Sequence, residues 1–259
     1  MVEVSAAGST PPVVQEYALN AIWAPPVQTF PLGTLSPATP VTVSAGVPGE
    51  GAGNLETKAS ADEYTFTVPA GGSRTVIDCL STDSSYATWT LLNSAGPVVR
   101  TDTFLSWAGR RFDQVLPAGV YRWRLVPGNE QTGRYSMRFY LPPAAQTFPV
   151  VLSTTTATAV NNGVPAPGAG TLETWLSKDS YTFTATAGQE LSLDTRTVAA
   201  ALRWELRNPS GVVVATNTLV DDQRVPGLVA GKYTFTVFID PASTATDYTY
   251  ALNLQLVGG

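Results

Sequence analysis

An internal duplication dominates this sequence of 259 residues. Several blocks of the first half recur in the same order in the second half, at a nearly constant distance along the chain. The recurring blocks begin at Gln28 and Gln146, Gly51 and Gly168, Tyr64 and Tyr181, Trp89 and Trp204, and Leu116 and Leu228. Self-similarity of this length predicts two domains of the same fold, residues 28–145 and residues 146–259.

Residues 1–27 form an N-terminal segment that matches part of a further repeat. Tyr17–Asn20 has the same sequence as Tyr250–Asn253, near the end of the second copy. Residues 16–24 are therefore expected to resemble the last strand of a preceding copy. Two interpretations stay open: the chain is a piece of a longer array, or the strand at Tyr17–Trp23 pairs with another molecule and mediates self-assembly.

The pattern of apolar residues predicts an all-β fold. Apolar residues alternate with threonines at Tyr64–Val68 and at Tyr233–Val237, which gives each strand one apolar and one polar face. Turn sequences at Asn93–Gly96 and Asn208–Gly211 separate such strands. We therefore expect two tandem antiparallel β-sandwiches of the jelly-roll or immunoglobulin-like kind.

Four recurring aromatic residues have structural interpretations. Trp89 and Trp204 occupy equivalent positions and alternate with leucines, which favours a place in the core of each domain over an exposed binding platform. Tyr121 and Tyr233 end a Leu-x-x-Gly-x-Tyr spacing. In Greek-key sandwiches that arrangement lets the phenol form a hydrogen bond to nearby backbone.

Composition excludes several classes of function. The chain has no His and a single Cys, Cys79, so it cannot form a Ser-His-Asp triad, a Cys-His pair, a His-bearing zinc site or an internal disulfide. Its 15 basic and 20 acidic residues give a net charge of −5, which argues against a nucleic-acid partner. We expect no catalytic activity and no cofactor. No stretch has the character of a secretory signal or of a membrane span.

Two tryptophans that do not recur are candidates for ligand binding. Trp175 aligns with Lys58, and Trp107 lies near Arg110 and Arg111 in a segment that is longer in the first copy. Aromatic rings with guanidinium groups can stack on a sugar or hold a carboxylate. Inter-domain packing or simple exposure is the alternative interpretation.

Carboxylates recur between the copies, and they have two interpretations. The pairs are Glu56 and Glu173, Asp62 and Asp179, and Asp78 and Asp194. Paired carboxylates can transfer protons or bind Ca²⁺, but no Asp-x-Asp-x-Asp-Gly loop is present. The more common task of such residues is to cap turns and loop amides. Cys79 follows Asp78 and is interpreted as a small buried apolar side chain.

The repeated motifs resemble those of bacterial pre-peptidase C-terminal domains. The resemblance is carried in both copies by Gly-Ala-Gly-x-Leu-Glu-Thr, Tyr-Thr-Phe-Thr and Leu-x-x-Gly-x-Tyr. It implies a jelly-roll-like sandwich attached to secreted or cell-surface proteins, without catalytic activity of its own.

From these observations we expect a non-catalytic module of a larger extracellular or surface protein. It would act as a structural spacer or adhesion unit, with neighbouring domains of its host as partners. A carbohydrate-binding module and a subunit of a filament assembled by strand exchange are the alternatives.

Overall fold

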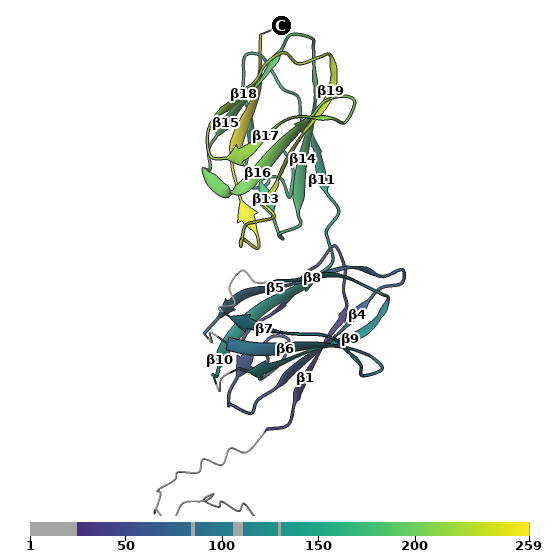
Figure 1. Ribbon diagram of the computed structural model, residues 1–259. Coiled ribbons are helices and arrows are strands. Elements are labelled where there is room, and N and C mark those ends of the chain that lie inside the picture. The colour runs from purple at the N-terminus through teal and green to yellow at the C-terminus, as the bar shows by residue number, and fades with distance from the viewer. Residues whose placement is uncertain (1–24, 84–85, 106–110, 129–130, 259) are drawn as a thin grey trace, which may run out of the picture.

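The computed structural model describes residues 25–83, 86–105, 111–128 and 131–258, and it is all-β there, as predicted. Two β-sandwiches follow each other along the chain (Figure 1). The first contains β1 (Gln28–Thr34), β2 (Val41–Val43), β3 (Asn54–Leu55), β4 (Asp62–Val68), β5 (Ser73–Thr82), β6 (Tyr86–Asn93), β7 (Val98–Leu105), β8 (Arg111–Leu116), β9 (Gly119–Pro127) and β10 (Gly133–Tyr140). The second contains β11 (Gln146–Pro149), β12 (Thr158–Val160), β13 (Thr171–Leu172), β14 (Lys178–Ala185), β15 (Glu190–Thr195), β16 (Ala199–Arg207), β17 (Val213–Leu219), β18 (Gln223–Val225), β19 (Gly231–Ile239), β20 (Tyr248–Thr249) and β21 (Leu252–Val257).

Both sandwiches have the same strand order. One sheet runs β1-β4-β9-β6-β7 in the first sandwich and β11-β14-β19-β16-β17 in the second. The facing sheet runs β2-β10-β5-β8 in the first and β12-β21-β15-β18 in the second. Neighbouring strands are antiparallel, with one exception in each sandwich: β1 pairs with β4, and β11 with β14, in parallel. Parallel neighbours require a crossover connection, and here the chain passes through the facing sheet between the two strands.

Each sandwich has a separate apolar core. Trp89 and Trp204 are buried in equivalent places, at the positions where the sequence predicts core residues. Trp89 stacks on Trp123 with 4.2 Å between ring centroids, and Trp204 stacks on Phe235 at 5.5 Å. Because a buried indole removes roughly 150–250 Å² from water, these rings contribute a large share of the stability of each core.

The two predicted corner tyrosines bond to backbone four residues upstream. The Tyr121 hydroxyl donates to the carbonyl of Pro117 at 3.0 Å. In the second sandwich the Tyr233 hydroxyl accepts from the amide of Val229 at 2.9 Å. These bonds tie the loop before β9 and β19 to the strand that follows it.

A buried carboxylate joined to two phenols links the two sheets of each sandwich. In the second sandwich the hydroxyl of Tyr250, which lies just before β21, donates to Asp179 Oδ2 at 2.7 Å, and the Tyr181 hydroxyl lies 2.8 Å from the Tyr250 hydroxyl. In the first sandwich Tyr135 donates to the equivalent Asp62. Since β14 and β21 belong to facing sheets, the group fastens one sheet to the other.

A glycine completes this arrangement. The amide of Gly170 donates to Asp179 Oδ2 and to the Tyr181 hydroxyl, each at 3.1 Å. Gly170 has a φ of +74°, and a Cβ there would lie 2.4 Å from the backbone carbon of Asn161. Only glycine fits both the conformation and the space, which explains the repeated Gly-Ala-Gly motif.

Burial of Asp179 has a consequence for the pH dependence of stability. Burial raises the pKa of Asp179 to about 6, against the hydrogen bonds from Tyr250 and Gly170 that favour the charged form. An unfolded Asp titrates near pH 3.9. A carboxyl with a higher pKa in the folded state stabilises the fold fully below about pH 4, and that contribution is lost as the pH rises through about 6.

We expect Asp179→Asn to flatten this pH dependence. Two pKa units correspond to about 2–3 kcal/mol, so the fall in unfolding free energy of the second sandwich between pH 4 and pH 6.5 should shrink by about that amount. Urea unfolding at several pH values, followed by circular dichroism, measures it. Asp221→Asn, at an exposed position, is the matched control. Identical pH profiles for Asp179→Asn and the wild type would contradict the expectation.

The N-terminal prediction lies outside the described residues. Residues 1–24, which include the strand predicted at Tyr17–Trp23, are not among them. Strand-mediated self-assembly through this segment therefore stays a prediction.

Candidate functional site: the interface between the two sandwiches

Part of the outer face formed by β5 and β10 is buried in the first sandwich, unlike the equivalent face of the second. In the second sandwich β21 alternates strictly between buried and half-buried residues, as a sheet with one face on a core should. In β10 the core-facing residues Met137 and Phe139 are buried, but so are Arg138 and Tyr140 on the opposite face. Asp78, on the same outer face of β5, is fully buried. Something must therefore cover this face.

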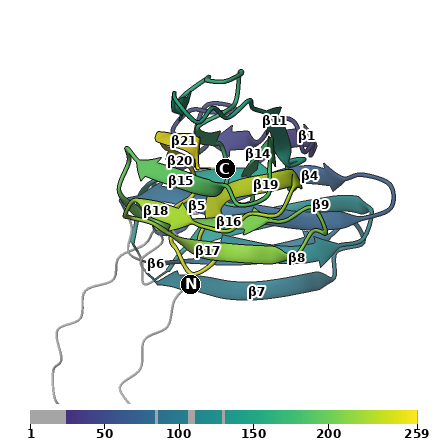
Figure 2. The ribbon, with the colours of Figure 1, turned by 90° about the horizontal axis from the view of Figure 1, so that it is seen from above.

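The second sandwich covers it. Figure 1 shows this sandwich standing end-on over the side of the first sandwich that contains β5 and β8, and Figure 2 shows the same arrangement from above. Arg138 Nη2 donates to Asp247 Oδ2 at 2.6 Å, and Arg138 Nη1 donates to the carbonyl of Glu173. Glu173 follows β13 and Asp247 precedes β20, so both belong to loops at one end of the second sandwich.

A row of charged residues crosses the covered face. Arg138, Asp78 and Arg111 lie directly opposite one another on β10, β5 and β8. Arg111 Nε lies 3.4 Å from Asp78 Oδ1, and the Tyr140 hydroxyl donates to Asp78 Oδ2 at 2.9 Å. Arg111 Nη2 also donates to the carbonyl of Ala245 in the second sandwich, at 3.1 Å. Both arginines of this row thus bond across the domain boundary.

Trp175 packs against the same row. The guanidinium carbon of Arg111 lies 4.0 Å from the centroid of the Trp175 ring, and that of Arg74 lies 5.7 Å from it. Arg74 itself forms a bidentate ion pair with Asp113. Its Nε donates to Asp113 Oδ1 at 2.7 Å, and its Nη2 donates to Asp113 Oδ2 at 2.6 Å. A cation over an indole face is attractive, and the attraction grows when water is excluded. Trp175 is therefore the aromatic contact of the interface.

Burial shifts the ionisation of the groups in this row. Burial raises the pKa of Asp78 to about 6, although the hydrogen bond from Tyr140 and the charges of Arg111 and Arg138 favour the carboxylate. Burial also lowers the pKa of Arg111, and the Asp78 charge opposes that change. Burial and the nearby Asp78 charge raise the pKa of Tyr140 above its usual range. The hydrogen bond from Tyr140 and the charges of the two arginines together favour the ionised form of Asp78 at neutral pH.

The structure brings two of the four predicted ligand-binding residues together. Arg111 and Trp175 are in contact with each other across the interface. Their contact agrees with inter-domain packing, which the sequence analysis gave as an alternative to ligand binding. Trp107 and Arg110 lie outside the described residues. Ligand binding by this group stays a prediction.

The recurring carboxylates are in three different environments. Asp62 and Asp179 are buried in the tyrosine groups, and Asp78 is buried at the interface. Asp194 lies on an open face, where it pairs with Arg196 at 2.6 Å. Within the described residues, no group of three or more His, Cys, Asp or Glu side chains is placed to hold a metal ion. Ca²⁺ binding remains untested.

Cys79 is buried in the core of the first sandwich, among its apolar residues. Burial and the neighbouring Asp78 charge raise the pKa of its thiol to about 12. Because the thiolate is the reactive form, this cysteine is chemically inert at neutral pH.

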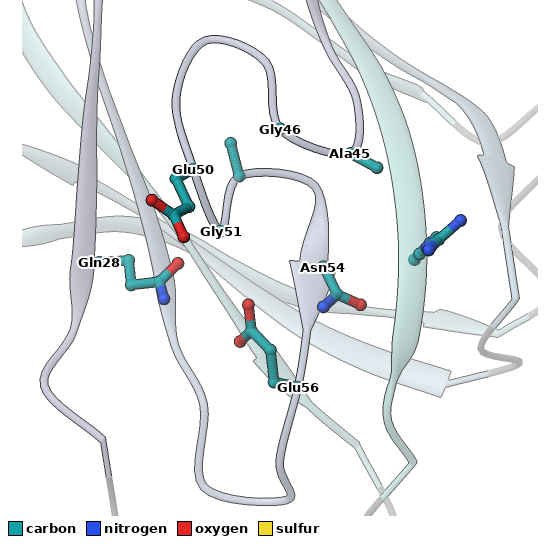
Figure 3. Close-up of a pocket in the computed structure, with 9 residues that line it drawn as sticks. Gln28, Ala45, Gly46, Glu50, Gly51, Asn54 and Glu56 are labelled. Carbon is teal, nitrogen blue, oxygen red and sulfur yellow. The ribbon is translucent and has the colours of Figure 1, made fainter.

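The described surface has several cavities, and two of them bear on these features. One, of about 220 Å³, opens beside the interface and is lined by Arg74, Trp175, Lys178 and Phe238 among others. A larger one, of about 530 Å³, lies at an end of the first sandwich and is lined by polar side chains (Figure 3). No helix in the described part of the chain is long and apolar enough to cross a membrane.

Comparisons with known proteins give distant similarities among solved structures. No protein-family model and no curated protein sequence matches the chain. PliG of Aeromonas hydrophila, a periplasmic inhibitor of g-type lysozyme, is 16% identical over 44% of this chain and 99% of its own, with a TM-score of 0.33. The pre-peptidase C-terminal domain of a Bacillus anthracis collagenase is 16% identical over 44% of this chain and 96% of its own, with a TM-score of 0.30. The CUB1-EGF-CUB2 segment of human MASP-1/3 is 8% identical over 84% of this chain and 99% of its own, with a TM-score of 0.27.

These similarities concern the β-sandwich fold alone. The collagenase domain matches 44% of the chain, so the match does not extend to both copies of the expected pair.

Proposed function

We propose that this chain is a non-catalytic module that holds two β-sandwiches in one fixed orientation, as a rigid spacer within a larger extracellular or surface protein. The observation that carries the proposal is the buried charged row of Asp78, Arg111 and Arg138, with its bonds into the second sandwich. Short proline linkers limit motion by themselves, and Pro142 and Pro143 join the two domains. A buried ionic interface restricts orientation further, since Arg111 and Arg138 reach their partners in the second sandwich only while the two sandwiches are docked.

The residues available for chemistry support a non-catalytic role. The chain has no His, and its single thiol is buried with a raised pKa. The strongly shifted carboxyls, Asp62, Asp78 and Asp179, are each buried against tyrosine hydroxyls instead of facing a cleft. Perturbed groups in such places are explained by packing, without a substrate.

Small-angle X-ray scattering tests the rigid-spacer proposal. We expect the wild-type curve to fit one arrangement of the two sandwiches, and the Arg138→Ala curve to require a broader set of arrangements. Arg224→Ala, which removes an exposed pair with Glu190 in the second sandwich, should leave the curve unchanged. A wild-type curve that requires many orientations would overturn the proposal.

The cavity beside the interface favours a second candidate function, binding of an acidic sugar. Its aromatic residues, Trp175 and Phe238, and its cations, Arg74 and Lys178, suit a ring that carries a carboxylate. Lys178→Gln tests this without touching the interface, because Lys178 is exposed and packs over Phe238 within its own sandwich. Retention on an acidic polysaccharide should be lost in the variant if this function is real, and a wild type that does not bind removes the candidate.

A further inference from the structure

One sheet edge in the described part of the chain lacks the usual protection against a further strand. An edge strand has unpaired backbone groups, and proteins keep it from pairing with another chain by making it short or by placing proline or charged residues on it. Among the described strands, β2, β3, β12, β13, β18 and β20 have at most three residues, β1 and β11 contain proline, and β7 and β8 carry charged side chains. β17 is also an edge strand, and its seven residues, Val213–Leu219, include neither proline nor a charge.

The equivalent edge of the first sandwich shows what β17 lacks. Ala215 and Asn217 of β17 occupy the register positions that Arg100 and Asp102 have on β7. Arg100 and Asp102 form an exposed ion pair at 3.0 Å. A further strand beside β7 would have to desolvate these charges, whereas a strand beside β17 would not.

Apolar side chains surround the start of this edge. Val212, Val213 and Val214 follow one another there, and all three are exposed. Val214 also lines a cavity of about 160 Å³ together with Val225 of β18 and the exposed Val229. Strand addition relies on backbone hydrogen bonds along an edge and on apolar contacts beside it, and β17 offers both.

The position of β17 leaves this edge accessible. Figure 2 shows β17 at the opposite side of its sheet from β11, in agreement with the strand order. The contacts with the first sandwich described above come from Glu173, Trp175, Ala245 and Asp247, all in loops outside β17. Docking of the two sandwiches and pairing at β17 can therefore occur together.

A second copy of this chain suits the edge. Two copies related by a two-fold axis bring identical edges together in antiparallel orientation. The valines at the start of one β17 would then lie opposite the threonines near the end of the other, so that β-branched residues meet across the pair. The chain has a net charge of −5, but no charged side chain of β17 would face one of like sign.

We propose that β17 is a self-association edge, at which two copies of the chain pair antiparallel and join their five-stranded sheets into one. This inference goes beyond the rigid-spacer function and does not rest on it. A single pair of strands buries less surface than most stable dimers do, so the association is weak and depends on concentration.

Sedimentation velocity of the intact chain over a wide range of concentrations tests the proposal. We expect a reversible equilibrium between monomer and dimer. Ala215→Arg/Asn217→Asp gives β17 the charges of β7 and should weaken the association at least tenfold. The first sandwich carries both residues in the same register, so this variant is expected to fold. Val99→Arg/Thr101→Asp, which adds the same two charges to β7, is the matched control and should leave the association unchanged.

Hydrogen–deuterium exchange of the wild-type chain locates the contact without any substitution. As the concentration rises, protection should increase at Val213–Leu219 and stay constant at Val98–Leu105. A chain that is monomeric at every concentration would overturn the proposal, and so would a dimer that persists in Ala215→Arg/Asn217→Asp. Concentration-dependent protection at Tyr17–Trp23 in place of β17 would assign self-association to the N-terminal segment and overturn it as well. The orientation of the sandwiches within one chain is measured on diluted, monomeric protein, so failure here is distinguishable from failure of the rigid-spacer proposal.

Discussion

Replacing Trp204 by alanine is expected to destabilise the second sandwich by about 3–5 kcal/mol, the usual cost of removing a large buried aromatic side chain. Trp204 is 2% exposed and stacks on Phe235 between β16 and β19, so its removal leaves a cavity that strands on both sides cannot close. Domains commonly have a total stability of about 5–15 kcal/mol, so most of the second sandwich's stability is at stake.

Hydrogen–deuterium exchange measures where this loss falls. Because each sandwich has a separate core, protection should fall in β16 and β19 and remain in β6 and β9. Trp89→Ala is the matched control, since it removes the equivalent buried side chain from the core of the first sandwich. It should lower protection in β6 and β9 and leave protection of the second core largely intact. An equal loss of protection in both sandwiches of Trp204→Ala would contradict the separation of the two cores.

Arg111→Ala is expected to destabilise the docked arrangement by about 3–5 kcal/mol at pH 7.5, because it removes one partner of a buried ion pair. Asp78 is fully buried and would lose its cation on β8, and the bond to Ala245 and the contact with Trp175 would disappear as well. The pKa of Asp78, already raised to about 6, would rise further. Its protonation then removes the unpaired charge.

The destabilisation by Arg111→Ala should therefore be smaller at pH 5 than at pH 7.5. A carboxyl with a raised pKa stabilises the folded state below that pKa and loses this contribution as the pH rises through it. Thermal unfolding at the two pH values measures the difference. Arg100→Ala, which removes an exposed pair with Asp102, should cost under about 1 kcal/mol at both. If Arg111→Ala lowered the stability by the same amount at both pH values, Asp78 would not be the group that the substitution leaves unpaired.

The parts of the fold that depend on local pattern could be predicted from the sequence. Alternation around Trp89 and Trp204 predicts core positions, and both side chains are buried. The Asn93–Gly96 turn predicts a hairpin, and β6 and β7 pair across it. The parallel pairing of β1 with β4 could not be predicted in this way, because the direction of a strand depends on a long connection through the other sheet.

The buried carboxylates show the limit of local patterns. Such residues were expected to cap turns and loop amides, and Asp179 does accept a hydrogen bond from the amide of Gly170. The local pattern did not reveal its second partner, the phenol of Tyr250, which lies about 70 residues away in sequence. Such a contact depends on how the two sheets face each other, which alternation within one strand does not reveal.

A signal for the interface was present in the comparison of the two copies. Tyr140 on β10 aligns with Gln255, and Val76 on β5 aligns with Ser192, so the outer face of the first sandwich is less polar than that of the second. Where the residues of one surface differ between duplicated domains, that surface has a different environment in each domain. The sequence alone does not reveal that the second sandwich covers the outer face of the first.

The distance between spin labels on the two sandwiches tests the fixed orientation most directly. Val120 and Val214 are exposed, one in each sandwich, and accept cysteine substitutions. Cys79 is buried with a thiol pKa raised to about 12, so it should not react with the label. Pulsed electron–electron double resonance should give one narrow distance distribution in the otherwise wild-type chain, and a broad one when Arg111→Ala is added. A broad distribution before Arg111 is changed would contradict the account.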